Sequence, residues 1–139
     1  PILEAHYGTE IPLEHRASFA GWQAEHSEFG SGTRLYRIHT AVEEGGSPFR
    51  PWWTTEAPKS EIQFRLDYAV KPEWNTGAEM SILEVPEGTT IEGFKGLAGY
   101  VDDFYIGGGE QVFIKPGSIL KDWVITGRSP WNIITGGSP

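Results

Sequence analysis

Hydrophobic and polar residues follow different patterns in successive parts of the first half of the chain. Over residues 13–28 the apolar positions recur at helical spacing, which predicts a helix that ends at the Phe-Gly-Ser-Gly segment. Residues 33–42 alternate between apolar and polar, which predicts a strand with Arg37 and His39 on one face. Residues 1–12 show neither pattern and are predicted to form an extended lead-in.

The pattern changes again at a pair of tryptophans. The Trp-Trp-Thr-Thr run over residues 52–55 has the composition of a short strand. Thr54 or Thr55 can cap a following helix that has Pro58 in its first turn and ends before Pro72. The apolar residues predicted to face inward on this helix are Ile62, Leu66, Ala69 and Val70.

Short apolar runs between glycines and prolines predict strands in the second half. These predicted strands cover residues 79–85, 89–94, 110–114 and 119–126. Residues 96–106 are predicted to form a loop that carries Phe104, and residues 128–139 a flexible tail. Helices gathered early and strands gathered late predict one α+β domain over residues 1–139.

Composition and charge exclude several classes of protein. The chain has no cysteine, which excludes disulfide scaffolds, thiolate zinc sites and cysteine nucleophiles. The net charge of −8 disfavours non-specific binding to nucleic acid and suits a basic partner. No apolar run reaches the ~20 residues that a membrane span needs. Because the chain begins at Pro1, we expect it to be either a piece of a longer protein or a chain whose leader has been removed.

The histidines predict no metal site. They are His6, His15, His26 and His39, and none forms a ligand pair at a metal-binding spacing. His39 beside Arg37 has the groups that a ribonuclease needs, a general acid–base next to a phosphate clamp. The alternative is that His39 is a half-buried strand residue with one hydrogen bond and that Arg37 pairs with a surface acid.

The segment over residues 107–118 carries the strongest signal. It reads Gly-Gly-Gly-Glu-Gln-Val-Phe-Ile-Lys-Pro-Gly-Ser. The order of Arg37, the threonines at 54 and 55 and this segment resembles the Arg…Ser/Thr…Glu order of the ADP-ribosyltransferase fold. Gln111 stands where that family has its catalytic Glu. With Gln at this position the segment resembles the secreted NAD glycohydrolase toxins of the tuberculosis-necrotizing-toxin type, which have Gln after a glycine-rich stretch.

The resemblance implies a fold and an activity. The implied fold has N-terminal helices and a split, strongly twisted antiparallel β core of the ADP-ribosyltransferase-like type. The implied activity is that of an NAD(P)+ nucleosidase toxin, which releases nicotinamide and ADP-ribose and uses NAD or NADP as substrate with no further cofactor. Such a domain is delivered to the cytoplasm of a target cell, acts in bacterial competition and has a cognate immunity protein.

The residue types of this segment fit that chemistry. Arg37 and Gln111 are predicted to be catalytic, because a guanidinium can bind phosphate or ribose and an amide can orient a ribose hydroxyl or a water. The predicted substrate-binding residues are Thr54, Thr55, Trp53, Gly108, Gly109, Glu110, His39 and Phe104. In a regular strand Glu110 and Gln111 point to opposite faces, so one of the two faces the site.

Three other functions remain open from the sequence. A mono-ADP-ribosyltransferase on the same fold would use Glu110 as its carboxylate. A toxin ribonuclease would use His39 and Arg37, against the acidic charge of the chain. A non-catalytic carbohydrate-binding β-domain would bind its ligand on exposed tryptophans.

Overall fold

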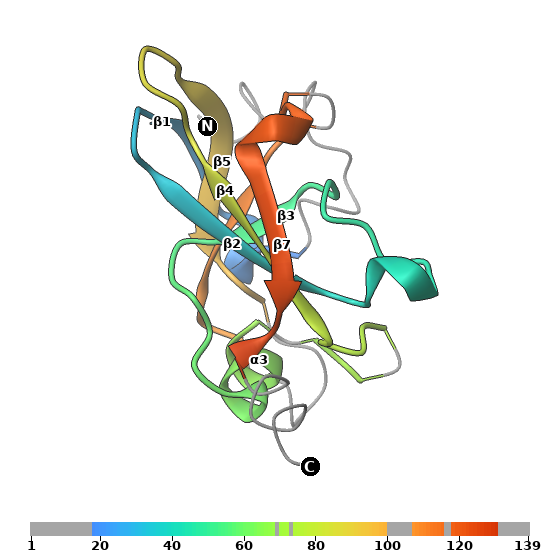
Figure 1. Cartoon of the computed structure of the whole chain (residues 1–139). Coiled ribbons are helices and arrows are strands. Elements are labelled where there is room, and N and C mark those ends of the chain that lie inside the picture. The colour runs from blue at the N-terminus through green and yellow to red at the C-terminus, as the bar shows by residue number, and fades with distance from the viewer. Residues whose placement is uncertain (1–17, 69, 73, 100–106, 116–117, 131–139) are drawn as a thin grey trace.

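Seven antiparallel strands form one sheet in the order β1-β5-β6-β3-β2-β4-β7 (Figure 1). The computed structural model describes residues 18–68, 70–72, 74–99, 107–115 and 118–130. The strands are β1 Glu25–Phe29, β2 Arg34–His39, β3 Trp52–Thr54, β4 Glu79–Glu84, β5 Ile91–Leu97, β6 Glu110–Phe113 and β7 Val124–Arg128. The helical elements are α3 Glu61–Asp67 and the 3-10 turns η1 Ala20–Trp22, η2 Val42–Glu44 and η3 Lys121–Trp123. The predicted sheet-rich α+β class is confirmed.

The sheet has a narrow joint between β2 and β3. These two strands pair only at Tyr36 and Thr54 within the described residues, whereas β2 pairs with β4 along its whole length. The joint lies between a β1-β5-β6-β3 half and a β2-β4-β7 half of the single sheet. No helix of the described part is long and apolar enough to cross a membrane.

The helix predicted over residues 13–28 is wrong in its described part. Strand β1 lies there and pairs antiparallel with β5 from Glu25 opposite Lys95 to Phe29 opposite Ile91. The only helical turn among residues 18–28 is η1, whose Gly21 has a φ of 63° and breaks the helical path. Helical spacing of alanines is a weak local signal, and pairing with a distant strand overrides it.

Helix α3 is shorter than predicted and presents a different face to the core. Its N-cap is Ser60 and not the predicted Thr54 or Thr55. The Ser60 Oγ accepts a hydrogen bond from the backbone N–H of Gln63 at 3.1 Å. The side chain of Ile62 was predicted to face inward, but it is 72% exposed, and Phe64 is buried instead. The face of α3 that packs against the protein therefore contains Phe64 and Arg65 rather than Ile62.

Two predicted strands are displaced along the chain. Strand β5 begins at Ile91 and continues to Leu97, into the predicted loop over residues 96–106. Strand β7 begins at Val124, after η3, and reaches Arg128, which pairs with Glu79. Arg128 therefore belongs to the sheet rather than to the tail. Residues 1–17, 100–106 and 131–139 lie outside the described residues.

The core lies on both faces of the sheet. One cluster contains Phe29, Leu35, Trp53, Leu83, Val85, Ile91, Val112 and Ile114. The other contains Phe19, Phe94 and Phe113, with Trp52 packed against it. Trp52 and Trp53 thus face opposite sides of the sheet, as the alternation of a strand predicts.

We predict that α3 is anchored by Phe64 and not by Ile62. Phe64→Ala should lower the free energy of unfolding by about 3–5 kcal/mol, because it leaves a cavity under the helix. Ile62→Ala on the same helix should change it by no more than about 0.5 kcal/mol, because the side chain is already in solvent. Urea unfolding of both variants measures the difference. Equal losses would mean that the helix is rotated relative to this structure.

Candidate functional site

Gln111 belongs to a row of four residues that crosses the centre of the sheet. In the strand register, Tyr36 lies opposite Thr54, Thr54 opposite Gln111 and Gln111 opposite Gly96. Directly opposed residues of antiparallel strands share a face, so the four lie on the same face. The Gln111 side chain is 8% exposed. Its Nε2 donates to the carbonyl of Ser18 at 3.0 Å, and no described group donates to its Oε1.

The glycine segment before Gln111 is docked on the end of α3. The N–H of Gly107 donates to the carbonyl of Leu66, and the N–H of Gly109 to that of Asp67, both at 2.8 Å. Carbonyls in the last turn of a helix have no partner within the helix, so these bonds satisfy them from outside. On its other side the segment pairs with β5, where Gly108 donates to the carbonyl of Ala98. The segment thus fixes the start of β6 to both the helix and the sheet.

Gly107 and Gly109 are required by close contacts rather than by access to a ligand. A Cβ at Gly107, whose φ is 76°, would lie 2.4 Å from the carbonyl oxygen of Ala98. A Cβ at Gly109 would lie 2.6 Å from Cε1 of Tyr68. Only Gly108 of the three has open space beside it. The missing side chain of Gly109 therefore makes room for the ring of Tyr68.

Tyr68 is a site residue that sequence reasoning missed. It follows α3, is half-buried and forms a hydrogen bond with Thr54 of the central row. Burial raises the pKa of the Tyr68 phenol, the hydrogen bond with Thr54 lowers it, and the carboxylates of Asp67, Glu56 and Glu110 raise it further. At neutral pH Tyr68 is therefore a neutral phenol close to three carboxylates. No periodicity or motif marks this position, because its contacts are made across the fold.

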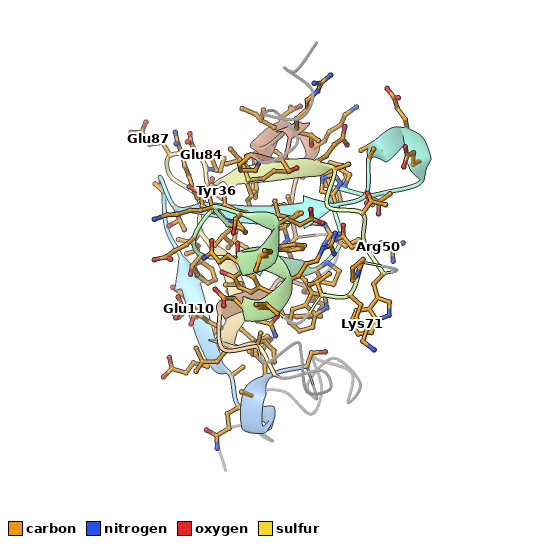
Figure 2. The ribbon with its side chains drawn as sticks, turned by 90° about the horizontal axis from the view of Figure 1, so that it is seen from below. Tyr36, Arg50, Lys71, Glu84, Glu87 and Glu110 are labelled. Atoms are coloured by element: carbon orange, nitrogen blue, oxygen red, sulfur yellow. The ribbon has the colours of Figure 1, made fainter. Side chains whose placement is uncertain are left out.

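Thr55 and Glu110 are the sequence neighbours of Thr54 and Gln111, and the alternation of the strands directs them to the other face of the sheet. The Thr55 hydroxyl donates to Oε1 of Glu110 at 2.9 Å. Glu110 is exposed whereas Gln111 is buried, so the predicted opposition of these two neighbours is confirmed. Figure 2 shows Glu110 on the same side of the molecule as Tyr36.

An open cavity lies at each end of the central row. Tyr36 and Thr55 line the first, of about 520 Å³, together with Glu56, Ala57, Lys59 and Gln63. Gly96 and Glu110 line the second, of about 350 Å³, together with Ala20, Gln23, Ala24, Glu25, Lys95 and Leu97. The side chains of Thr54 and Gln111 are buried between these two end residues of the row.

Arg37 leaves β2 on the face opposite to Gln111. It follows Tyr36 directly, so the alternation of the strand turns it away from the central row. Its Nε donates to the carbonyl of Ser47 at 2.9 Å and its Nη1 to that of Trp52 at 3.4 Å. Burial and the nearby Arg50 lower the pKa of Arg37 to about 10. No contact between described residues joins Arg37 to Gln111.

His39 is held in a buried polar chain. Its exposed fraction is 1%, and its Nδ1 lies 2.7 Å from the carbonyl oxygen of Thr40, which can only accept a hydrogen bond. Nδ1 therefore carries the proton, and Nε2 accepts from the Ser81 hydroxyl, also at 2.7 Å. Ser81 in turn lies 2.6 Å from the Thr126 hydroxyl. His39 is more buried than the predicted half-buried residue, and neither ring nitrogen is available to an external substrate.

The other predicted site residues are placed as follows. Trp53 is 1% exposed in the core, so its ring does not stack on an external ligand, and its Nε1 has no partner among the described residues. Gly108 is exposed to solvent and lies between Gly107 and Gly109. Phe104 lies outside the described residues. Within the described part, no group of three or more His, Asp or Glu side chains is placed to hold a metal ion.

We predict that Gly109→Ala destabilises the protein by about 1–3 kcal/mol, because the added methyl group displaces the Tyr68 ring. Gly127→Ala on β7 is the matched control, since a Cβ there meets nothing within 4 Å. It should change the free energy of unfolding by about 0.5 kcal/mol or less. Chemical unfolding measures both. If Gly109→Ala lowers the free energy of unfolding no more than Gly127→Ala does, the Tyr68 ring does not pack against Gly109.

We also predict that stability falls in acid through His39. Burial and the positive charge of Arg37 lower the pKa of His39 from 6.5, although a hydrogen bond to Thr40 opposes them. The unfolded chain therefore binds a proton below about pH 6.5 that the folded chain resists. The stabilisation that comes from keeping His39 neutral is complete above about pH 6.5. Below that pH the free energy of unfolding falls by at most about 1.4 kcal/mol per pH unit. Urea unfolding from pH 8 to pH 5 should show a shallower slope for His39→Gln, and an unchanged slope would contradict this assignment.

Comparison with known proteins relates the chain to others by fold alone. No family model and no curated protein matches it. It is similar to Tne2, solved in complex with Tni2, at a TM-score of 0.61 and 18% identity over 78% of this chain and 93% of that chain. It is similar to Tse6, in complex with Tsi6, at a TM-score of 0.53 and 15% identity over 80% and 82% of the two chains. It is also similar to Rhs1-CT, in complex with its cognate immunity protein RhsI1, at a TM-score of 0.50 and 16% identity over 66% and 70%.

Proposed function

We propose that this chain is the enzymatic domain of a delivered toxin that hydrolyses NAD+ or NADP+ at the bond between nicotinamide and ribose. The observation that carries the proposal is the position of Gln111. Its buried amide follows the docked glycine segment and lies in a sheet row whose end residues, Tyr36 and Gly96, each line a cavity. The resemblance of this glycine–glutamine segment to NAD glycohydrolase toxins supports the reaction, and the fold shared with Rhs1-CT, which was solved with its cognate immunity protein, supports a toxin domain.

The proposed reaction breaks one bond and forms one. The bond between C1′ of the ribose and the nicotinamide nitrogen breaks, and its electron pair leaves with nicotinamide. Water adds its oxygen to C1′ and releases a proton, which gives ADP-ribose. Positive charge builds up on the ribose in the transition state, so the enzyme gains most from groups that stabilise that charge.

The residues around the central row suit this reaction. The amide oxygen of Gln111 is available to accept a hydrogen bond from a ribose hydroxyl or from the attacking water. The carboxylates of Asp67 and Glu56 lie close enough to Tyr68 to raise its pKa. Their negative field favours a sugar that becomes positively charged.

We propose a cognate immunity protein as the partner of this domain. Rhs1-CT, which shares the fold, was solved with such a partner. The net charge of −8 suits a partner with a basic surface. We also propose that the domain acts in the cytoplasm of the cell to which it is delivered, because NAD and NADP are found there.

Glu110 supports a second candidate, a mono-ADP-ribosyltransferase. Its exposed carboxylate is oriented by Thr55 beside Gln111, and a carboxylate in this position can activate an acceptor. The ribonuclease alternative is not proposed, because His39 is buried with both ring nitrogens engaged.

We predict that the purified domain releases nicotinamide from NAD+ or NADP+ with no protein acceptor present. Gln111→Ala should lower the rate by about 100-fold or more, the size of effect expected when a polar group acting on the transition state is removed. Glu110→Gln should retain most of the hydrolysis, since this residue lies on the other face of β6. Chromatography of nicotinamide and ADP-ribose measures the rates, and circular dichroism checks that each variant is folded.

The outcomes separate the two candidates. Release of nicotinamide that needs an acceptor protein and is lost in Glu110→Gln would favour the transferase. If both dinucleotides survive with and without acceptors, both candidates are refuted. Arg37→Ala tests the other predicted catalytic residue separately, because it lies on the opposite face from Gln111.

A further inference from the structure

We propose that the free edge of β7 is a surface through which two copies of this chain form a dimer. Strand β7 lies at one end of the sheet and pairs with β4 alone among the described strands. It is the orange-red strand at the front of the ribbon in Figure 1. The occupant that this edge fits best is the β7 of a second copy, in antiparallel orientation. The inference does not depend on the proposed hydrolysis.

The middle of β7 lacks the features that usually prevent pairing between sheet edges. An edge strand presents unpaired backbone N–H and C=O groups, and proteins block such edges with proline, bulges or charged side chains. The register between β4 and β7 is regular from Glu79 opposite Arg128 to Leu83 opposite Val124, with no bulge and no proline. In the middle of the strand Ile125 is 74% exposed. Strand β7 is therefore open to a further strand.

The other edge of the sheet is protected by charge. Strand β1 carries the titratable side chains Glu25, His26 and Glu28, all of them exposed. Glu28 lies directly opposite Glu92 on β5, so a second acidic strand beside β1 would add to an existing repulsion. Two β1 edges would therefore repel each other, and β7 is the edge that suits a copy of itself.

The side chains at the two ends of β7 have opposite charges. Asp122 lies in the turn η3 before the strand, Arg128 is the last residue of the strand, and both are exposed. Neither forms an ion pair within the described part of the chain. They lie at equal separations in sequence from Ile125, so an antiparallel copy centred on Ile125 brings each Asp122 next to the Arg128 of the other copy. The edge is thus complementary to itself, as a two-fold interface requires.

The same arrangement brings apolar side chains together. Ile125 then lies opposite Ile125 of the other copy, and directly opposed residues of antiparallel strands share a face. Within each copy Ile125, Trp123 and Ile82 are among the residues that line an open cavity of about 440 Å³. A Cβ at Gly127 would meet nothing within 4 Å, which leaves room beside this glycine for the Trp123 ring of the other copy. Burial of these apolar groups favours the pairing.

Strand β7 is already ordered in the single chain. All five of its residues pair with β4, and the Thr126 hydroxyl lies 2.6 Å from that of Ser81 on β4. Association therefore orders little further backbone, which lowers its entropic cost. In β7 and the turn before it Lys121 and Arg128 outnumber Asp122, so the net charge of −8 arises elsewhere in the chain.

The dimer joins the two candidate sites through one sheet. Ile125 lies opposite Ile82, and Ile82 lies opposite Tyr36, so β7 continues the row that contains Gln111. Pairing of Ile125 with its counterpart extends this row from one chain into the other. The Gln111 side chains of both copies then lie on the same face of one continuous antiparallel sheet.

Analytical ultracentrifugation over a concentration series tests the dimer. The wild-type chain should show a monomer–dimer equilibrium below about 1 mM, and Ile125→Lys should weaken the dimer at least about tenfold. Ile62→Lys is the matched control, because Ile62 on α3 is 72% exposed and lies outside the proposed interface. Both side chains are already in solvent, so both variants should fold, which circular dichroism checks. A wild type that stays monomeric, or equal weakening by the two variants, overturns the proposal.

Exchange of the end charges tests the antiparallel arrangement. Asp122→Arg and Arg128→Asp should each weaken the dimer by about threefold or more, because each brings like charges together twice per dimer. The double variant should recover most of the wild-type affinity, since opposite charges meet again in reversed positions. Losses that simply add in the double variant would overturn this arrangement.

Hydrogen exchange gives a readout of the interface that does not depend on the variants. The backbone amides of β7 should exchange more slowly at high protein concentration, because those at the free edge gain partners in the dimer. The amides of β1 should be unaffected by concentration. Slowing at β1 and not at β7 would place the contact at the opposite edge of the sheet and would overturn the proposal.

Discussion

Two hydrogen bonds from the glycine segment to the last turn of α3 determine the geometry of the central site. They satisfy carbonyls at a helix end that would otherwise lack partners, and they fix the position at which β6 begins. Because β6 begins there, Gln111 lies opposite Thr54 and Gly96 in the sheet. The same docking brings Tyr68 against Gly109, where any larger residue would collide with the ring. A short helix of seven residues thereby positions residues that lie far from it in the sequence.

The strand register separates charges of opposite sign. Tyr36 and Arg37 are neighbours on β2, but the alternation of the strand directs one to the row that contains Gln111 and the other to the opposite face. The carboxylates of Asp67 and Glu56, which raise the pKa of Tyr68, lie near the row, whereas Arg37 donates to the backbone carbonyls of Ser47 and Trp52 on the opposite face. A shift of β2 by one residue would exchange these environments and would place a charged side chain in the core.

The sequence predicts the strands better than the helices, for a physical reason. The strands around Met80 and Val112 are short apolar runs bounded by glycine or proline, so local pattern and tertiary pairing agree. The helix predicted over residues 13–28 depended on alanine spacing alone, and pairing of β1 with β5 overrides it. Gln111 could be identified because its signal is a contiguous motif. Tyr68 could not, because its significance arises only from contacts with residues distant in the sequence.

The joint between β2 and β3 lies between the surroundings of Gln111 and those of Arg37. These strands pair only at Tyr36 and Thr54 in the described part, and Arg37 donates to the carbonyl of Trp52, just beyond that pair on β3. The guanidinium of Arg37 therefore lies beside β3 on one face of the sheet, whereas Gln111 lies on the opposite face. The charged groups near Gln111 are the carboxylates of Asp67 and Glu56, which raise the pKa of Tyr68. The proposed substrate has a cationic nicotinamide ring, and these carboxylates complement that ring on the face that carries Gln111.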